Sequence, residues 1–166
     1  GFVYLFALNQ GIWTHQASLL APDGAADDWF GWSVGIFGDT IVVGAIWDDD
    51  NGSNSGSAQV FALDNNIWTH QAKIVAPDGA ADDRFGLSVG IYMDTVVVGS
   101  KGDNDNGVDS GSLYLFTRIE GAWDYHAKLL APKTVDEFGR SVVAYNGTVV
   151  AVSDSGEVYV FSSDSE

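Results

Sequence analysis

The chain contains an internal repeat with a spacing of 55 residues. Residues 11–45 and 66–100 share 25 identities in 35 aligned positions. The octapeptide Ala-Pro-Asp-Gly-Ala-Ala-Asp-Asp stands unchanged at 21–28 and at 76–83. Identity at this level indicates a duplicated sequence, and a repeat of this length predicts similar structural units packed side by side.

A third, more distant copy follows the first two. It keeps Trp123, Ala131-Pro132 and Phe138-Gly139 at the corresponding places. The whole chain, 1–166, is therefore expected to be one segment made of repeats at about 1–57, 58–112 and 113–166.

Each copy consists of short stretches rich in β-branched and aromatic residues, which favour strands. Two-residue connections such as Gly38-Asp39 and Asn146-Gly147 join two of these stretches in every copy, and Asn-Gly is a strong hairpin signal. No window of helical length combines a 3.6-residue apolar period with capping residues. The sequence predicts about thirteen strands and no helix.

Four antiparallel strands in a repeat of this size are typical of a β-propeller blade. A β-sandwich or barrel could use the same hairpins, but neither requires near-identical copies at a fixed spacing. We therefore predict an all-β fold, a β-propeller with three four-stranded blades. Because a closed propeller has ~4–8 blades, this segment is expected to belong to a larger ring, completed by more of the same polypeptide or by other copies.

A Phe-Gly pair in each copy is followed, after a hairpin, by Gly-Ala or a related pair. The pairs are Phe30-Gly31 with Gly44-Ala45, Phe85-Gly86 with Gly99-Ser100, and Phe138-Gly139 with Ala151-Val152. Over essentially its whole length the chain resembles the FG-GAP repeats of integrin α-subunit propellers and of bacterial and algal surface proteins, although the Pro of Gly-Ala-Pro is absent. The resemblance implies an extracellular or lumenal surface protein used for adhesion or assembly and seldom for catalysis.

The family's calcium loop does not carry over to this sequence. That loop, Asp-x-Asp-x-Asp-Gly-x-x-Asp, lies just before the strand that leads into Gly-Ala-Pro. In this chain the corresponding turn has only two residues in each copy, for example Gly38-Asp39.

The net charge restricts the partners. The 23 Asp and Glu against 7 Lys and Arg give a formal charge of −16, so nucleic acid and anionic membranes are poor partners. No apolar run approaches the roughly 20 residues of a membrane-spanning helix, and direct membrane insertion is not expected. A protein, a glycan or further blades are the partners that we expect.

Fifteen of the 23 acidic residues lie in two families of equivalent loops. Closely spaced carboxylates in Gly-containing loops suit Ca²⁺, which takes 6–8 oxygen ligands. The alternative is that Asp, Asn, Gly and Ser only form solvated turns, and both interpretations stay open. The candidate metal ligands are Asp48, Asp50, Asp103, Asp105 and Asp109, with Ca²⁺ as the candidate cofactor.

Three tryptophans of the first copy, Trp29, Trp32 and Trp47, do not recur. Their equivalents are Arg84, Leu87 and Gly102. Loop tryptophans that the repeat does not require are candidates for binding a protein or a sugar, and contact with a neighbouring blade is the alternative. The sequon Asn51-Gly-Ser53 makes Asn51 a candidate glycosylation site.

No constellation of catalytic residues emerges. Residues 31–35 and 86–90 match G-x-S-x-G, but that motif requires a strand, a sharp turn and a helix, whereas here strand follows strand. We therefore predict a non-enzyme: an interaction or adhesion scaffold on an extracellular or lumenal surface protein, assisted by calcium if the acidic loops bind it. The alternatives are a structural subunit that completes a ring, a filament or a larger complex, and, more weakly, a glycan-binding or carbohydrate-active propeller.

Overall fold

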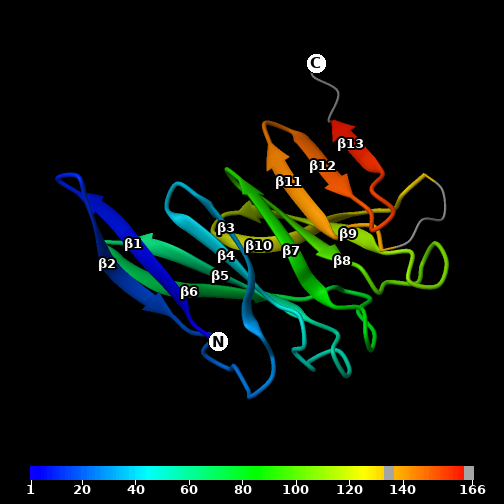
Figure 1. Cartoon of the computed structure of the whole chain (residues 1–166), viewed down its shortest axis with the longest axis horizontal. Coiled ribbons are helices and arrows are strands. Elements are labelled where there is room, and N and C mark those ends of the chain that lie inside the picture. Colours follow the sequence, from blue (N-terminus) through cyan, green and yellow to red (C-terminus); the bar gives the residue numbers. More distant parts are fainter. Residues whose placement is uncertain (133–136, 163–166) are drawn as a thin grey trace.

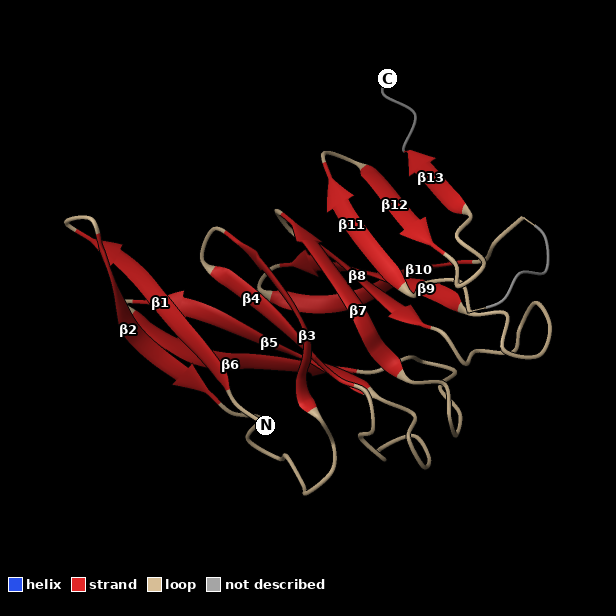
Figure 2. Ribbon diagram, viewed as in Figure 1, coloured by secondary structure: helices blue, strands red, loops and turns tan. Residues whose placement is uncertain are grey.

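The computed structural model describes residues 1–132 and 137–162, and in this part of the chain it contains thirteen strands (Figure 2). The all-β prediction is confirmed. No helix is present in the described residues, so none there could cross a membrane. The strands are β1 (Val3–Asn9), β2 (Ile12–Leu19), β3 (Phe30–Phe37), β4 (Thr40–Ala45), β5 (Ser57–Asp64), β6 (Ile67–Ile74), β7 (Phe85–Tyr92), β8 (Thr95–Ser100), β9 (Ser112–Ile119), β10 (Ala122–Leu129), β11 (Ser141–Tyr145), β12 (Thr148–Val152) and β13 (Val158–Ser162).

The strands form four antiparallel sheets that follow one another along the molecule (Figure 1). Their orders are β1-β2, β3-β4-β5-β6, β7-β8-β9-β10 and β11-β12-β13. In place of three four-stranded sheets, the described residues therefore give sheets of two, four, four and three strands. By the 55-residue spacing β1 and β2 correspond to β5 and β6, and β11 to β13 correspond to β7 to β9. The two smaller sheets thus repeat parts of the four-stranded ones.

The Phe-Gly and Gly-Ala pairs meet between neighbouring sheets. A Cβ atom on Gly44 would lie 2.0 Å from the carbonyl oxygen of Gly86, and one on Gly99 would lie 2.1 Å from that of Gly139. The Ser33 hydroxyl also donates to the Gly86 carbonyl, at 2.7 Å. The two halves of the motif are therefore two sides of one contact, in which backbone packs on backbone with no room for a side chain.

The serines of the two G-x-S-x-G matches both serve this contact. Ser88 donates to the Gly139 carbonyl at 2.7 Å, as Ser33 does to Gly86 one repeat earlier. Their position between strands, where the hydroxyl bridges two sheets, accounts for the motif in structural terms.

The hydrophobic core consists of three clusters that lie between consecutive sheets. Phe85 is fully buried in the largest cluster, and its ring meets Tyr114 edge-on at 5.4 Å. Phe30 and Phe138 occupy the same place in the other two clusters. The recurring Phe thus provides the centre of each inter-sheet core, while its Gly lets the sheets approach.

Candidate functional site

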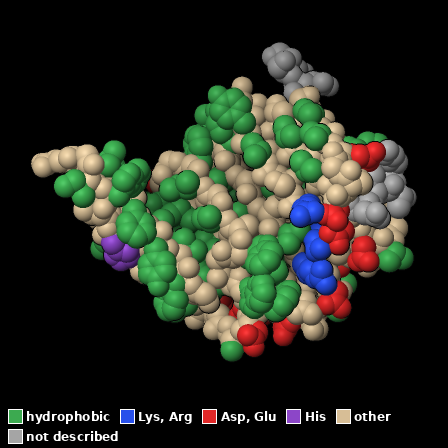
Figure 3. Space-filling model, in the orientation of Figure 1, with side chains coloured by type: hydrophobic (Ala, Val, Ile, Leu, Met, Phe, Trp, Pro, Cys, Tyr) green, Lys and Arg blue, Asp and Glu red, His purple; other side chains and the backbone are tan. Residues whose placement is uncertain are grey.

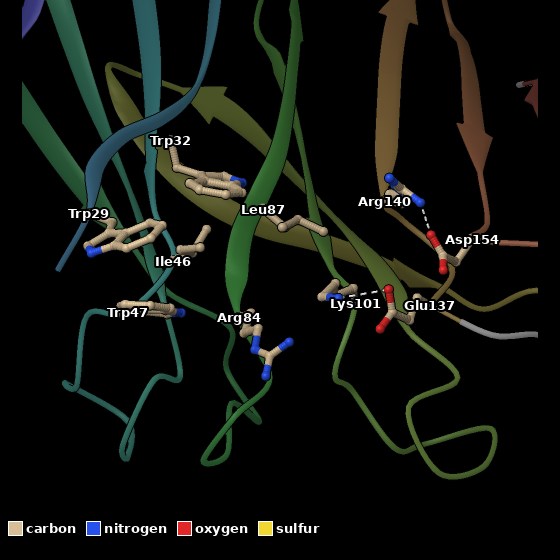
Figure 4. A pocket seen from close by; sticks show the side chains of 10 residues that line it. All are labelled: Trp29, Trp32, Ile46, Trp47, Arg84, Leu87, Lys101, Glu137, Arg140 and Asp154. Atoms are coloured by element: carbon tan, nitrogen blue, oxygen red, sulfur yellow. Dashed lines mark hydrogen bonds and ion pairs between the residues drawn. The ribbon is translucent and has the colours of Figure 1, made fainter. Parts of the chain in front are cut away.

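A pocket of about 630 Å³ opens where the sheets that begin with β3, β7 and β11 come together (Figure 4). Its lining comes from all three sheets, so no single repeat forms it alone. The lining residues are Trp29, Trp32, Ile46, Trp47, Arg84, Leu87, Lys101, Glu137, Arg140 and Asp154.

The residue before each Phe-Gly pair lines this pocket, with the same backbone conformation in all three repeats. Trp29, Arg84 and Glu137 have φ of 55°, 54° and 51°, which is uncommon for bulky side chains. Because the backbone repeats, it presents a different side chain from the same position each time.

The second residue after each Phe also lines the pocket. In β3 and β7 the strand pairing shifts between Phe30 and Ser33 and between Phe85 and Ser88, which is a bulge, and bulges re-aim side chains. This places Trp32 and Leu87 in the lining, and Arg140 takes the corresponding place in the third repeat.

The three tryptophans predicted to bind a partner lie together at one end of the pocket. The ring centroids of Trp29 and Trp32 are 5.3 Å apart, and those of Trp29 and Trp47 are 4.0 Å apart. Trp47 is buried, whereas Trp29 and Trp32 are 42% and 49% exposed. The result is an aromatic surface with a buried indole beneath it and two exposed ones.

Charged side chains form the other end (Figure 4). Lys101 pairs with Glu137 at 2.7 Å, and Arg140 pairs with Asp154. Arg84 lies between these pairs and the tryptophans, and its buried Nε–H has no acceptor within the described residues. In the space-filling view a group of Lys and Arg side chains accordingly lies beside a group of hydrophobic ones (Figure 3).

Sequence reasoning missed these charged residues as members of the site. The repeat alignment already pairs Arg84 with Trp29 and Leu87 with Trp32. Treating all variable positions around the Phe-Gly pairs as one surface would have brought Arg84, Glu137 and Arg140 to the tryptophans.

The candidate calcium ligands lie elsewhere, around two lysines. The Lys73 ammonium lies 2.9 Å from Asp23, 2.7 Å from Asp48 and 2.6 Å from Asp50. Each of these groups joins a loop of one repeat to a strand of the next. The second group has the same geometry, with Lys128 at 2.9, 2.7 and 2.6 Å from Asp78, Asp103 and Asp105.

Lysine is thus the counter-ion of both carboxylate groups. Burial alone would lower the pKa of Lys128, but its hydrogen bonds to Asp103 and Asp105 raise that pKa well above its usual value. Burial likewise works against ionisation of Asp78, yet hydrogen bonds from Lys128 and Tyr114 lower its pKa. A calcium ion at these carboxylates would have to displace an ammonium group that is charged at all physiological pH values.

The remaining candidate residues lie apart from the lysines. Asp109 is exposed, and its backbone amide donates to the side-chain oxygen of Asn104 at 2.8 Å. The Nδ2 of Asn51, the atom that a glycan would modify, donates to the Ala76 carbonyl at 2.9 Å. Calcium binding and glycosylation stay predictions.

Comparison with known proteins gives the family. No curated protein matches this chain. The computationally designed Ika4 protein, a solved structure, is similar with a TM-score of 0.43 and 14% identity, over 86% of this chain and 95% of its own. A model of the FG-GAP repeat matches residues 13–61 and 68–116, which is more than half of the chain. The chain belongs to the FG-GAP repeat family.

Proposed function

We propose that this chain is a non-catalytic interaction module, a segment of a β-propeller that recognises a protein or glycan through the pocket shared by its three repeats. Domains of FG-GAP repeats are generally interaction modules of this kind, and propellers present variable loops on a rigid frame. Adhesion at an extracellular or lumenal surface is the setting that we propose.

One observation carries the proposal: the frame of the pocket is constant and its lining varies. Phe30, Phe85 and Phe138 keep one residue type because they fill the same core position. The neighbouring position, with the same backbone conformation, holds Trp29, Arg84 and Glu137. Positions that served packing alone would keep one chemistry, so the variation supports a role in recognition.

Calcium assistance remains part of the proposal in a restricted form. The carboxylates of Asp78, Asp103 and Asp105 lie within 4.8 Å of one another, a spacing suited to a cation. Lys128 supplies that positive charge. We therefore propose that calcium acts at these loops only under conditions that move the lysine away.

Exposed apolar sheet faces support a second candidate, a structural subunit that packs against further sheets or copies. Val34 and Ile36 on β3 are 57% and 61% exposed, whereas Val89 and Ile91 at the same positions of β7 are 8% exposed. The difference arises because β3 packs on that face of β7. A head-to-tail contact that repeats this packing would bury Val34 and Ile36.

Binding to arrays of defined oligosaccharides and peptides tests the proposal. Trp29→Ala removes part of the aromatic surface, and Trp13→Ala removes an indole on β2 that is 67% exposed and outside the pocket. We expect the wild type and Trp13→Ala to bind the same ligands, and Trp29→Ala to lose at least tenfold in affinity, as for a central interface aromatic. No ligand for the wild type, or equal binding by all three proteins, would overturn the proposal.

Sedimentation of the purified chain tests the second candidate. Concentration-dependent association that Ile36→Asp abolishes would support the structural subunit. A monomer at every concentration would refute it.

A further inference from the structure

We infer that the pocket binds an oligosaccharide that carries one carboxylate sugar, with neutral pyranose rings on Trp29 and Trp32 and the carboxylate on Arg84. The inference rests on the proposed function, because it names the ligand class of the same pocket. Three features of the lining support it, and the charge of the whole chain limits the ligand to a single carboxylate.

The aromatic end offers faces of the right kind for sugar rings. Trp29 and Trp32 are about half exposed, and their rings are inclined by only 33° with centroids 5.3 Å apart. A pyranose presents a flat face of C–H groups that packs on an indole face, and successive rings of an oligosaccharide have a comparable spacing. Trp47, buried against Trp29 at 4.0 Å, holds the first indole in place. Rigid aromatic side chains of this kind lose little conformational entropy on binding.

Arg84 is the cation of the pocket that has no carboxylate partner among the residues described. Lys101 and Arg140 are both paired with acids, whereas the buried Nε–H of Arg84 lacks an acceptor. A buried donor without an acceptor is costly, and a guanidinium binds a carboxylate through two parallel hydrogen bonds. A ligand carboxylate at Arg84 would therefore satisfy the group that the protein leaves unsatisfied.

The ion pairs suit the hydroxyl groups of a sugar. Lys101 and Glu137 are partly exposed, at 19% and 29% of their side chains, and Arg140 and Asp154 more so. Each pair offers a donor and an acceptor at once, and a hydroxyl group can use both. A row of such pairs beside an aromatic surface provides polar contacts without demanding further charge on the ligand.

The charge of the whole chain sets a limit on the ligand. At −16 the protein repels a long polyanion at a distance, and salt screens this repulsion. The local positive charge at Arg84 can compensate for one carboxylate and not for many. The ligand is therefore an oligosaccharide with a single acidic sugar among neutral ones.

An acidic peptide is the competing ligand. Peptide anchors fill deep desolvated pockets in most interfaces, whereas the exposed part of this aromatic end is formed by indole faces. Flat faces bounded by donor and acceptor pairs favour the sugar, and the peptide becomes an outcome of the test.

Calorimetric titration with two matched tetrasaccharides tests the inference. One has three xylose units and one glucuronate, and the other is its carboxyl-reduced form. We expect the acidic form to bind roughly tenfold more tightly to the wild type, which is the size of one charge-assisted contact. Arg84→Gln should bind both forms equally, at the affinity of the neutral one. Trp32→Ala should lose at least tenfold for both, and Arg118→Gln, a control outside the pocket, should leave both affinities unchanged.

The outcomes separate this inference from the proposed function. Equal affinity of the wild type for the two sugars, or an unchanged preference in Arg84→Gln, would overturn the assignment of the carboxylate to Arg84. If neither sugar bound while a peptide bound in a Trp29-dependent way, the sugar inference would fall and the interaction module would stand. Binding that no pocket variant affects would overturn both. A polyuronate that bound more tightly than the tetrasaccharide at low salt would refute the limit of one carboxylate.

Discussion

Replacing Lys128 by methionine would remove the ammonium group from among three carboxylates while keeping a side chain of similar length. The structure predicts a large loss of stability, because Asp103 would remain buried without a counter-ion. Its side chain is 4% exposed, whereas those of Asp78 and Asp105 are 49% and 58% exposed. The three pairs therefore differ in what they contribute.

The magnitude follows from these exposures. Removing one partner of a buried ion pair costs about 3–5 kcal/mol, and an exposed pair contributes about 0–1 kcal/mol. Asp103 keeps hydrogen bonds from the Tyr114 hydroxyl at 2.7 Å and from the Asp105 amide at 3.0 Å, so its loss lies at the lower end of that range. We expect Lys128→Met to lower the free energy of unfolding by about 3–4 kcal/mol at pH 7.

Urea unfolding followed by circular dichroism measures this loss. Arg118→Met is the matched control, because it changes the net charge equally but breaks a pair with Asp94, whose side chain is 62% exposed. It should cost about 1 kcal/mol or less. Equal losses in the two variants would refute the argument that burial of Asp103 decides the effect.

The pH dependence provides a second check. The pKa of Asp78 is lowered in the folded wild type, so its contribution to stability is present above the unfolded value of 3.8 and is lost as the pH falls through the lowered folded pKa. In Lys128→Met that lowering disappears, and protonation relieves the uncompensated charge. The difference between the wild type and the variant should be full at pH 7 and narrow below about pH 4. A difference that stayed constant would contradict the electrostatic explanation.

Calcium completes the experiment. In Lys128→Met the three carboxylates are free to bind the ion, and a ligand that binds only the folded state stabilises it. We expect millimolar calcium to raise the urea midpoint of the variant and to leave that of the wild type unchanged. A rise in the wild type would instead support the calcium site predicted from the sequence.

Two further substitutions test the contact between sheets. Gly44→Ala should destabilise the chain by about 1–3 kcal/mol or more, because its Cβ would lie 2.0 Å from the Gly86 carbonyl oxygen; Gly24→Ala, whose nearest atom would be Ala21 Cβ at 3.1 Å, is the control, and equal urea midpoints would contradict the close-approach argument. Ser88→Ala should cost about 1–3 kcal/mol, since it leaves the Gly139 carbonyl without its donor, and the half-buried Ser33→Ala should cost less. A larger loss in Ser33→Ala would show that burial does not set the cost.

The repeat was enough to predict the all-β fold because each part of the motif has a local physical cause. Two-residue turns such as Gly38-Asp39 determine the hairpins, and the recurring Phe and Gly provide a core residue and a close approach. The division of the strands among sheets was harder to predict. Each four-stranded sheet begins at a Phe-Gly strand, so β3 and β4 pair with β5 and β6 across the boundary near residue 57. Repetition is the same from any starting point, and only hydrogen bonding shows where one sheet ends.

The acidic loops show where sequence reasoning failed to find a partner. Composition identified Asp48 and Asp103 as cation ligands, and the structure places a cation against each, but it is the ammonium group of Lys73 or Lys128. Both lysines lie on strands 25 residues further along the chain, at the position that holds Ser18 in the first copy. The co-occurrence of lysine with the Asp-rich loop in two copies, and of serine in the copy without a preceding loop of this kind, was the available signal.

The pocket and the acidic groups make opposite use of the same repetition. Around Lys73 and Lys128 the distances to three carboxylates agree to the printed digit in both repeats, as expected where the chemistry serves the frame. Around the Phe-Gly pairs the backbone is equally constant, with φ between 51° and 55°, but the side chains change from indole to guanidinium to carboxylate. Selection for stability alone would act on both sets of positions alike. The divergence at Trp29, Arg84 and Glu137 therefore points to a requirement outside the frame, and a ligand that spans three repeats can impose it.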